Sequence, residues 1–121
     1  MHSEFGGKVF ALVDASDSEG FSNLFTPEGR LRFANGEPMV GPEAIEAGCR
    51  GFFSTIKGMH HTVLHEWVSG ADSVVELSVD YDRLDGGTVT VPVVSIWHRG
   101  EDGLIDDYRV FFDLAPVFAP A

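Results

Sequence analysis

Three turn signals divide the second half of the sequence at nearly even intervals, and they limit the fold more than any other feature of the chain. They are "SGAD" at 69–72, "DGG" at 85–87 and "GEDG" at 100–103. The segments between them alternate apolar and polar residues, which is typical of strands with one buried face. Strands joined by such short turns pair in antiparallel order. The pattern therefore predicts a meander of four antiparallel strands from residue 59 onward.

The first half of the sequence predicts helices and one strand. Ser3 can cap a first helix that runs to about Ala15, and Asp17 or Ser18 can cap a short second helix. The alternating sequence "RLRF" then predicts a strand, and "GPEAIEA" begins a third helix. Helices followed by an antiparallel sheet predict an α+β fold in which the helices cover one face of the sheet. No repeat or linker interrupts the sequence, so we expect a single domain over residues 1–121.

Composition argues against several classes of partner. The formal net charge is −11, with 19 acidic against 8 basic side chains, so nucleic acid and anionic membranes would be repelled. No apolar run approaches the ~20 residues that cross a bilayer, and the first residues lack the pattern of a signal peptide. The single cysteine, Cys49, allows no intrachain disulfide and no cysteine-rich zinc site. We expect a cytoplasmic protein that binds neither nucleic acid nor membrane.

The turns also allow the two faces of the meander to be assigned. If each turn holds an even number of residues, the numbers of paired residues sum to an odd value. By this rule the first face carries Glu76, Ser78, Asp80, Val93, Ser95, Trp97, Tyr108, Val110 and Phe112. The opposite face carries Tyr81, Arg83, Val94, Ile96 and Phe111. Both faces are apolar enough to need cover, so we expect a homodimer formed through the second, outer face.

The stretch "MHHTVLHEWV" at 59–68 places three histidines in a predicted strand. The same rule brings His61 near Asp80 and His65 near Glu76 on the first face, which also holds Trp97 and Tyr108. Either imidazole could then act as a general acid or base oriented by a carboxylate. A bulge or a three-residue loop at the "SGAD" turn would reverse the strand and send residues 60 and 66 inward instead.

A metal site, with Glu76 and Asp80 as further ligands, is a more specific interpretation of these histidines. The spacing of the histidines along the strand argues against it. Adjacent His60 and His61 point to opposite faces of a strand, and His65 lies about 13 Å along the strand from His61. One histidine and one carboxylate are too few ligands. We expect no metal and no cofactor.

Four stretches of the chain, in this order and spacing, resemble the SnoaL-like branch of the nuclear-transport-factor-2-like superfamily, also called ketosteroid-isomerase-like. They are "LFTPEGRLRFANGEPMVGPEAI", the histidine that opens a strand ending in Trp67, "VDYDRLDGGTVTVP" and "GLIDDYRVFFDLAP". The resemblance runs almost end to end. It implies a cone-shaped curved antiparallel sheet wrapped by three N-terminal helices (a cystatin-like roll), an apolar cavity between them, and frequent dimerisation. The family includes ketosteroid isomerase, limonene epoxide hydrolase, polyketide cyclases and proteins without catalysis, so the fold does not settle the function.

The epoxide hydrolase constellation is not retained. That branch is similar in its last strand, but Val110 stands where it has a catalytic aspartate. Its Arg-x-Asp on the preceding long strand falls on Glu76 and Ser78 or, with a small shift, on Ser78 and Asp80. The polar position of its first strand falls near Phe33. These departures argue against epoxide hydrolysis by that constellation and against a plain isomerase site.

Our first hypothesis is a small isomerase- or cyclase-type enzyme that moves a proton, without a cofactor, on an apolar carbonyl compound of polyketide, steroid or terpenoid class. Asp80 or His61 would transfer the proton, and the Tyr108 hydroxyl would stabilise the oxyanion. The substrate-binding residues would be Phe33, Phe53, His65, Glu76, Ser78, Trp97, Val110 and Phe112. The same residues could instead form a structural ion pair and an ordinary aromatic core. The alternatives are therefore a non-catalytic protein that binds a small apolar ligand, or a dimerisation module with a vestigial cavity.

Overall fold

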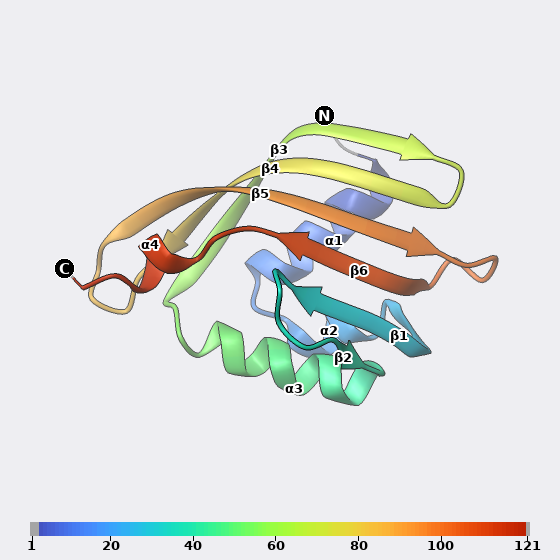
Figure 1. Ribbon diagram of the computed structural model, residues 1–121, viewed down its shortest axis with the longest axis horizontal. Coiled ribbons are helices and arrows are strands. Elements are labelled where there is room, and N and C mark those ends of the chain that lie inside the picture. The colour runs from blue at the N-terminus through green and yellow to red at the C-terminus, as the bar shows by residue number, and fades with distance from the viewer. Residues whose placement is uncertain (1–2, 121) are drawn as a thin grey trace.

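The computed structural model describes residues 3–120 and shows one six-stranded sheet (Figure 1). The strands are β1 (Phe25–Phe33), β2 (Met39–Val40), β3 (Gly58–Ser69), β4 (Asp72–Asp82), β5 (Thr88–Arg99) and β6 (Ile105–Phe111). Their order across the sheet is β2-β1-β6-β5-β4-β3. Strands β3 to β6 form the predicted antiparallel meander, and β1 adds to it in parallel with β6. The α+β fold is confirmed, with one parallel pair that the sequence did not predict.

The helices of the described residues are α1 (Glu4–Asp14), α2 (Ser18–Ser22), α3 (Pro42–Phe53) and the short α4 (Ala115–Phe118). The Ser3 hydroxyl accepts a hydrogen bond from the Gly6 N–H, and the Asp17 carboxylate accepts one from the Gly20 N–H, so both predicted caps form. Helix α4 was not predicted from the sequence. None of these helices could span a membrane.

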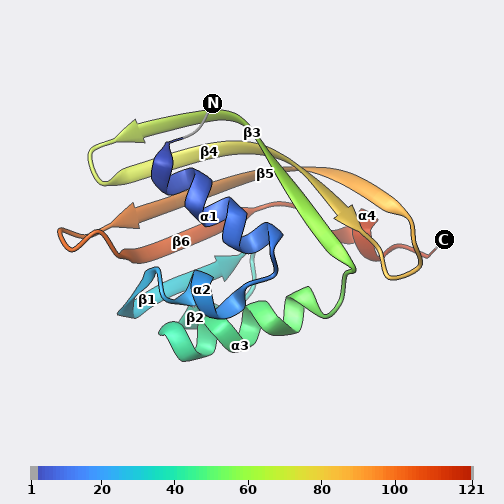
Figure 2. The same cartoon turned by 180° about the vertical axis from the view of Figure 1, so that it is seen from behind.

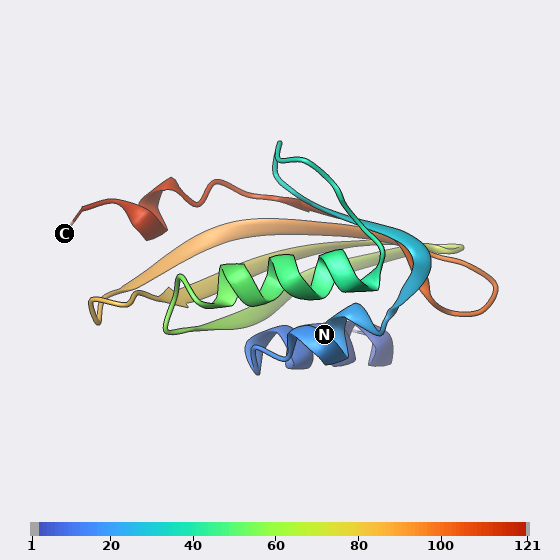
Figure 3. The ribbon, with the colours of Figure 1, turned by 90° about the horizontal axis from the view of Figure 1, so that it is seen from below.

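Helices α1, α2 and α3 lie on one side of the sheet and leave its other face largely open, where only the short α4 lies near one end. Figure 2 shows α1 crossing the face that is turned away from the viewer in Figure 1, and Figure 3 shows the curved sheet and α1 from the side of α3. We call the helix-covered face the inner face and the other the outer face. The core lies on the inner face, where side chains such as Val9, Ile45, Leu77 and Val79 are fully buried.

The β4–β5 hairpin overturns one step of the face assignment. Asp82 pairs with Thr88, so the loop between the strands has an odd number of residues, 83–87, and every pair is shifted by one. Gly86 supplies a positive φ of 97° in this loop, and the Asp85 carboxylate accepts the Gly87 N–H. As a result Tyr81 lies on the inner face, and the three β4 side chains expected in the cavity lie on the outer face: Glu76, Ser78 and Asp80.

The β5–β6 pairing follows the expected rule. Trp97 pairs with Tyr108 and Ser95 pairs with Val110. All four side chains lie on the inner face, as the sequence predicted.

Strand β3 contains the bulge that the sequence left open, at Leu64 rather than at the turn. Before it, His61 pairs with Val79 on the inner face; after it, His65 pairs with Glu76 on the outer face. The expected neighbourhood of His65 and Glu76 is correct, with 4.0 Å between His65 Nε2 and Glu76 Oε1, but it lies outside the cavity.

The bulge also turns Glu66 inward. Its carboxylate accepts hydrogen bonds from the Ser3 N–H and hydroxyl, at 2.6 and 2.8 Å, at the start of α1. Because the bulge adds one residue, both His61 and Glu66 can face α1 from the same strand.

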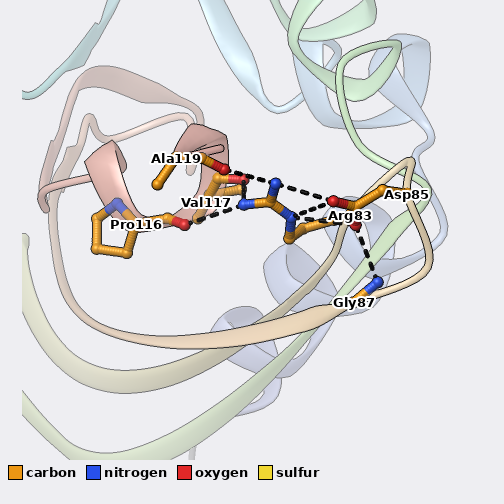
Figure 4. Close-up of polar contacts among 6 residues, drawn as sticks. All are labelled: Arg83, Asp85, Gly87, Pro116, Val117 and Ala119. Atoms are coloured by element: carbon orange, nitrogen blue, oxygen red, sulfur yellow. Dashed lines mark hydrogen bonds and ion pairs between the residues drawn. The ribbon is translucent and has the colours of Figure 1, made fainter. Parts of the chain in front are cut away.

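Two of the residues that the sequence predicted at a dimer interface, Tyr81 and Arg83, make contacts within the chain. Tyr81 is buried on the inner face, with 2% of its surface exposed. The Arg83 guanidinium donates to the carbonyl oxygens of Val117, at 2.8 Å, and Ala119, at 2.6 Å, and forms an ion pair with Asp85 at 3.0 Å (Figure 4). Arg83 therefore holds the C-terminal segment. The other three predicted contact residues, Val94, Ile96 and Phe111, do lie on the outer face.

Candidate functional site

An aromatic cavity lies on the inner face of the sheet. Its walls come from α1, α2, α3 and five strands, and they comprise Val13, Phe21, Leu31, Phe33, Cys49, Phe52, Phe53, Met59, His61, Tyr81, Val93, Ser95, Tyr108, Val110 and Phe112. Its volume is ≈ 50 Å³. A single water needs roughly 10–15 Å³ of cavity volume, so the cavity as it stands holds a few waters.

The cavity wall contains a histidine–carboxylate pair. His61 Nδ1 lies 2.6 Å from Asp14 Oδ1. The backbone N–H of His61 also donates to the two carboxylate oxygens of Asp14, at 3.0 and 3.1 Å. Strand β3 is at the edge of the sheet, so this N–H has no neighbouring strand to bind, and Asp14 takes the place of one.

The pair lies between the cavity and the solvent. The His61 side chain is 10% exposed and stacks on Phe10 at 5.2 Å between ring centroids. The Asp14 side chain is 23% exposed and lines an open groove between α1 and β3, together with His60 and His61. His61 thus borders the cavity and the groove at once.

This geometry selects one imidazole tautomer. A carboxylate only accepts hydrogen bonds, so Nδ1 must carry the proton that it shares with Asp14. In the neutral ring Nε2 is then left as an acceptor. The pair has the parts of a general base whose ring is oriented by a carboxylate.

Two phenols supply hydrogen-bond donors to the same cavity. Burial raises the pKa of Tyr108 far above its usual range, and a side-chain hydrogen bond with Ser95 opposes part of that rise. Burial, and then the negative charge of Asp14, raise the pKa of Tyr81 in the same direction. Both hydroxyls therefore stay protonated and can donate to a ligand oxygen.

Cys49 also lines the cavity, but as a thiol. Burial, with a smaller contribution from the charge of Glu46, raises its pKa to about 12. A thiol with so high a pKa is a poor nucleophile at neutral pH.

The structure brings together six of the predicted site residues and separates five others. The cavity is lined by His61, Tyr108, Phe33, Phe53, Val110 and Phe112. The expected positions of Asp80, Glu76, Ser78 and His65 in the cavity are wrong, because the β4–β5 loop and the β3 bulge turn them outward. Asp80 instead accepts a hydrogen bond from the Thr90 hydroxyl at 2.6 Å.

Trp97 is on the inner face but beside the cavity, under α1. It is 1% exposed and packs against Phe5, Phe10 and Tyr108. Its indole Nε1–H has no hydrogen-bond partner among the described residues. Trp97 therefore supports the Tyr108 ring from behind and does not line the cavity.

Asp14 is the functional candidate that sequence reasoning missed. It is the last residue of α1, where the helix dipole disfavours a negative charge, and the last turn of α1 has no basic residue. An acidic residue at an uncompensated helix C-terminus was the available signal. It marks an unusual carboxylate but does not identify the partner, which is 47 residues away in the sequence.

No group of three or more histidine, cysteine, aspartate or glutamate side chains within residues 3–120 could hold a metal ion.

Residues 7–108 match the SnoaL-like domain family. The chain belongs to this family. No curated protein matches this SnoaL-like chain in sequence.

Solved structures of SnoaL-like and related proteins share the fold at low identity. A protein with a ketosteroid isomerase-like fold from Catenulispora acidiphila, in complex with trimethylamine, has a TM-score of 0.88 at 18% identity, over 98% of this chain and 92% of that chain. A putative SnoaL-like polyketide cyclase from Jannaschia has a TM-score of 0.77 at 22% identity, over 100% and 99%. TerC co-crystallised with polyporic acid has a TM-score of 0.81 at 20% identity, over 93% and 92%. At these identities the likeness shows the fold alone.

Proposed function

We propose that this SnoaL-like protein catalyses cofactor-free proton transfer, of isomerase or cyclase type, on a small apolar carbonyl compound of polyketide, steroid or terpenoid class. The observation that carries the proposal is the 2.6 Å contact between His61 Nδ1 and Asp14 Oδ1 in the wall of an aromatic cavity. The fold shared with a putative polyketide cyclase supports the class of reaction.

The proposed base is His61, and Asp14 replaces Asp80 as its partner. With Nδ1 bound to Asp14, Nε2 takes a proton from the carbon next to the substrate carbonyl. Asp14 stabilises the imidazolium that forms, and the same ring returns the proton to another position of the enolate. The groove on the far side of the pair lets the proton exchange with solvent.

The phenols stabilise the developing enolate oxygen. Tyr108 and Tyr81 both line the cavity, and burial keeps both hydroxyls protonated. Neutral donors in an apolar site favour the charge of the transition state over the uncharged carbonyl of the substrate, which is the property that lowers a barrier.

The cavity limits the substrate. Its wall of phenylalanines suits a flat, uncharged molecule. A benzene-sized ring occupies a cavity of about 150 Å³, so the aromatic side chains that enclose the present ≈ 50 Å³ must move apart when a ring compound enters. No lysine or arginine lines it within the described chain, so a substrate carboxylate or phosphate would have no countercharge there.

The experiment uses cyclohex-3-enone as a minimal carbonyl probe, followed by the ultraviolet absorbance of the conjugated ketone. Asp14→Asn is expected to lower the rate about 10²- to 10⁴-fold, and Tyr108→Phe about 10²-fold. Asp80→Asn is the matched control, because it makes the same substitution on the outer face, and its rate should match the wild type. Equal rates for Asp14→Asn and wild type would overturn the proposal.

A second candidate is the binding of a small amine without catalysis. The Catenulispora relative of the same fold contains trimethylamine, and the rings of Phe33, Phe52 and Phe112 pack together in this cavity. Aromatic walls attract organic cations through the negative faces of their rings. Calorimetric titration with trimethylamine tests this candidate. Binding that Phe52→Ala weakens about tenfold, with no turnover of the enone, would favour it over the enzyme.

A further inference from the structure

A second pocket lies on the outer face of the sheet, where β1, β2 and β6 meet. Its volume is ≈ 280 Å³, and it is lined by Arg30, Arg32, Pro38, Asp107 and Arg109. We call it the arginine pocket. Its charged side chains come from β1 and β6, which lie side by side in the sheet (Figure 1). The aromatic cavity is on the inner face, and the two pockets share no residue.

The arginine pocket concentrates positive charge in an acidic protein. It holds three of the eight lysine and arginine side chains of a chain whose net charge is −11. Asp107 is the only acidic side chain of residues 3–120 that lines it, 3.6 Å from Arg30 and 3.1 Å from Arg109. Three guanidinium groups and one carboxylate leave the pocket a formal charge of +2.

The strand register places two of these arginines directly opposite each other. In the parallel pair of β1 and β6, Arg30 pairs with Asp107, but Arg32 pairs with Arg109. Like charges directly opposite on neighbouring strands repel and destabilise the pairing. An anion held between Arg32 and Arg109 would turn this repulsion into attraction.

Hydrogen bonds within the chain orient both guanidinium groups and leave their ends available. Arg32 Nε donates to the carbonyl oxygen of Gly36, and Arg109 Nε donates to Asp107 Oδ2, each at 3.1 Å. The terminal nitrogens of both side chains have no hydrogen-bond partner within the described part of the chain. A guanidinium has five N–H donors in a rigid plane, so each of the two side chains still has four to offer.

The charge of the pocket selects the class of ligand. Guanidinium groups bind the oxygens of carboxylates and phosphates in pairs, and the attraction grows with the charge of the anion. The phosphate of a monoester carries about −1.5 to −2 charges at neutral pH, which matches the pocket. A nucleic acid or an anionic membrane would also meet the 19 acidic side chains of the chain. A single small dianion avoids that repulsion.

We propose that the arginine pocket binds the phosphate group of a small molecule, either inorganic phosphate or a phosphate monoester. Arg32 and Arg109 hold the phosphate oxygens through their free terminal nitrogens, and Arg30 adds the third positive charge. The proposal does not depend on the function of the cavity, which lies on the other face of the sheet.

Calorimetric titration with inorganic phosphate, above its pKa of ~6, tests the site. Arg32→Gln and Arg109→Gln should each weaken binding about tenfold or more, because each removes a charged donor. Asp107→Asn should strengthen binding about threefold or more, because it removes the carboxylate that repels the ligand while its amide oxygen can still accept the Arg109 Nε–H. Acetate, a monoanion, should bind about tenfold more weakly than phosphate.

A parallel titration with phenyl phosphate distinguishes the two sources of the phosphate group. Tighter binding of phenyl phosphate than of inorganic phosphate supports a monoester as the ligand. Tighter binding of inorganic phosphate supports the free anion.

Arg50→Gln is the matched control. Arg50 is also exposed and also pairs with one carboxylate, that of Glu46, but on α3. Its loss should leave phosphate affinity unchanged. A wild-type protein that binds neither phosphate at millimolar concentration overturns the proposal. Binding that Arg50→Gln weakens as much as Arg32→Gln does overturns it as well, because only the net charge would then matter. Weaker binding in Asp107→Asn would place the ligand outside this pocket.

Discussion

At the scale of single residues, the site depends on a contact between side chains that lie far apart in the sequence. The sequence identified His61 as the histidine most suited to the cavity, and the structure places it there. It did not identify Asp14, because strand parity compares residues only within a meander, whereas Asp14 comes from the end of a helix. Helix–strand contacts of this kind depend on how the helix crosses the sheet, which no local pattern encodes.

A second histidine gives a prediction for pH dependence. His98 Nδ1 lies 2.7 Å from Asp106 Oδ1 on a half-exposed surface. The hydrogen bond to Asp106 is the main cause that raises the pKa of His98; desolvation opposes it, and the charges of Asp106, Asp72 and Asp107 add smaller rises. Because the folded-state pKa is raised, this pair stabilises the protein fully below the unfolded value of ~6.5, and the contribution is lost as the pH rises through the folded value.

Asp106→Asn should therefore bring the pKa of His98 back toward ~6.5 and remove this part of the pH dependence of stability. Histidine C–H signals followed by NMR during a pH titration measure the first effect, and urea unfolding at several pH values measures the second. An unchanged His98 titration in the variant would show that Asp106 is not its partner.

At the scale of elements, the sequence predicted what local chemistry determines. The caps at Ser3 and Asp17, the proline-initiated α3 and the meander all formed where their residues indicated. The predicted assignment of the β4 side chains to the two faces was wrong, because "DGG" indicates a turn but not the number of residues in the loop. One residue more or less in a loop exchanges the two faces of the strand before it.

The junction of β1 with β6 gives a stability prediction at a glycine. A Cβ at Gly29 would lie 2.8 Å from the backbone oxygen of Ile105 and 3.2 Å from the Phe25 side chain. Gly29→Ala should therefore lower the free energy of unfolding by about 1–3 kcal/mol. Gly51 in α3 has nothing within 4 Å of the added Cβ, so Gly51→Ala should raise it by about 0.5–1 kcal/mol.

Urea unfolding of the two variants checks this pair. The prediction fails if both alanines have the same sign of effect, because the difference rests only on the space around each Cβ.

The C-terminal segment depends on Arg83. Its guanidinium donates to the carbonyls of Val117 and Ala119 and is held in place by Asp85 (Figure 4). In turn, the hydrogen bond to Arg83 is the main cause that lowers the pKa of Asp85. Arg83→Met should release α4, and hydrogen exchange of the Val117 amide should become faster.

Arg32→Met is the matched control for this change. Arg32 also donates to a backbone carbonyl, that of Gly36, but on the outer face. Exchange at Val117 should not change in this control. Equal exchange in Arg83→Met and wild type would mean that the burial of Val117 alone holds the segment.

At the scale of the whole molecule, the order of helices and strands in the sequence was enough to predict the family and the α+β architecture. The site could not be predicted in the same way, because it depends on how these elements pack. The sheet carries the aromatic cavity on its inner face and half-exposed side chains on its outer face, and β5 contributes Ser95 to one and Ile96 to the other. The bulge at Leu64 is the feature that separates His61 from His65 between these two surfaces. Its position depends on tertiary contacts to α1, so the sequence offered it only as an alternative.

The measurement that tests the account most directly is the tautomer of His61, read from long-range ¹H–¹⁵N correlations at alkaline pH. The account predicts a proton on Nδ1, because Asp14 can only accept. In Asp14→Asn, the one amide oxygen is expected to accept the His61 backbone N–H, so the amide NH₂ donates to Nδ1 and moves the ring proton to Nε2. A wild-type His61 with its proton on Nε2, unchanged by Asp14→Asn, would contradict the pair on which the proposed function rests.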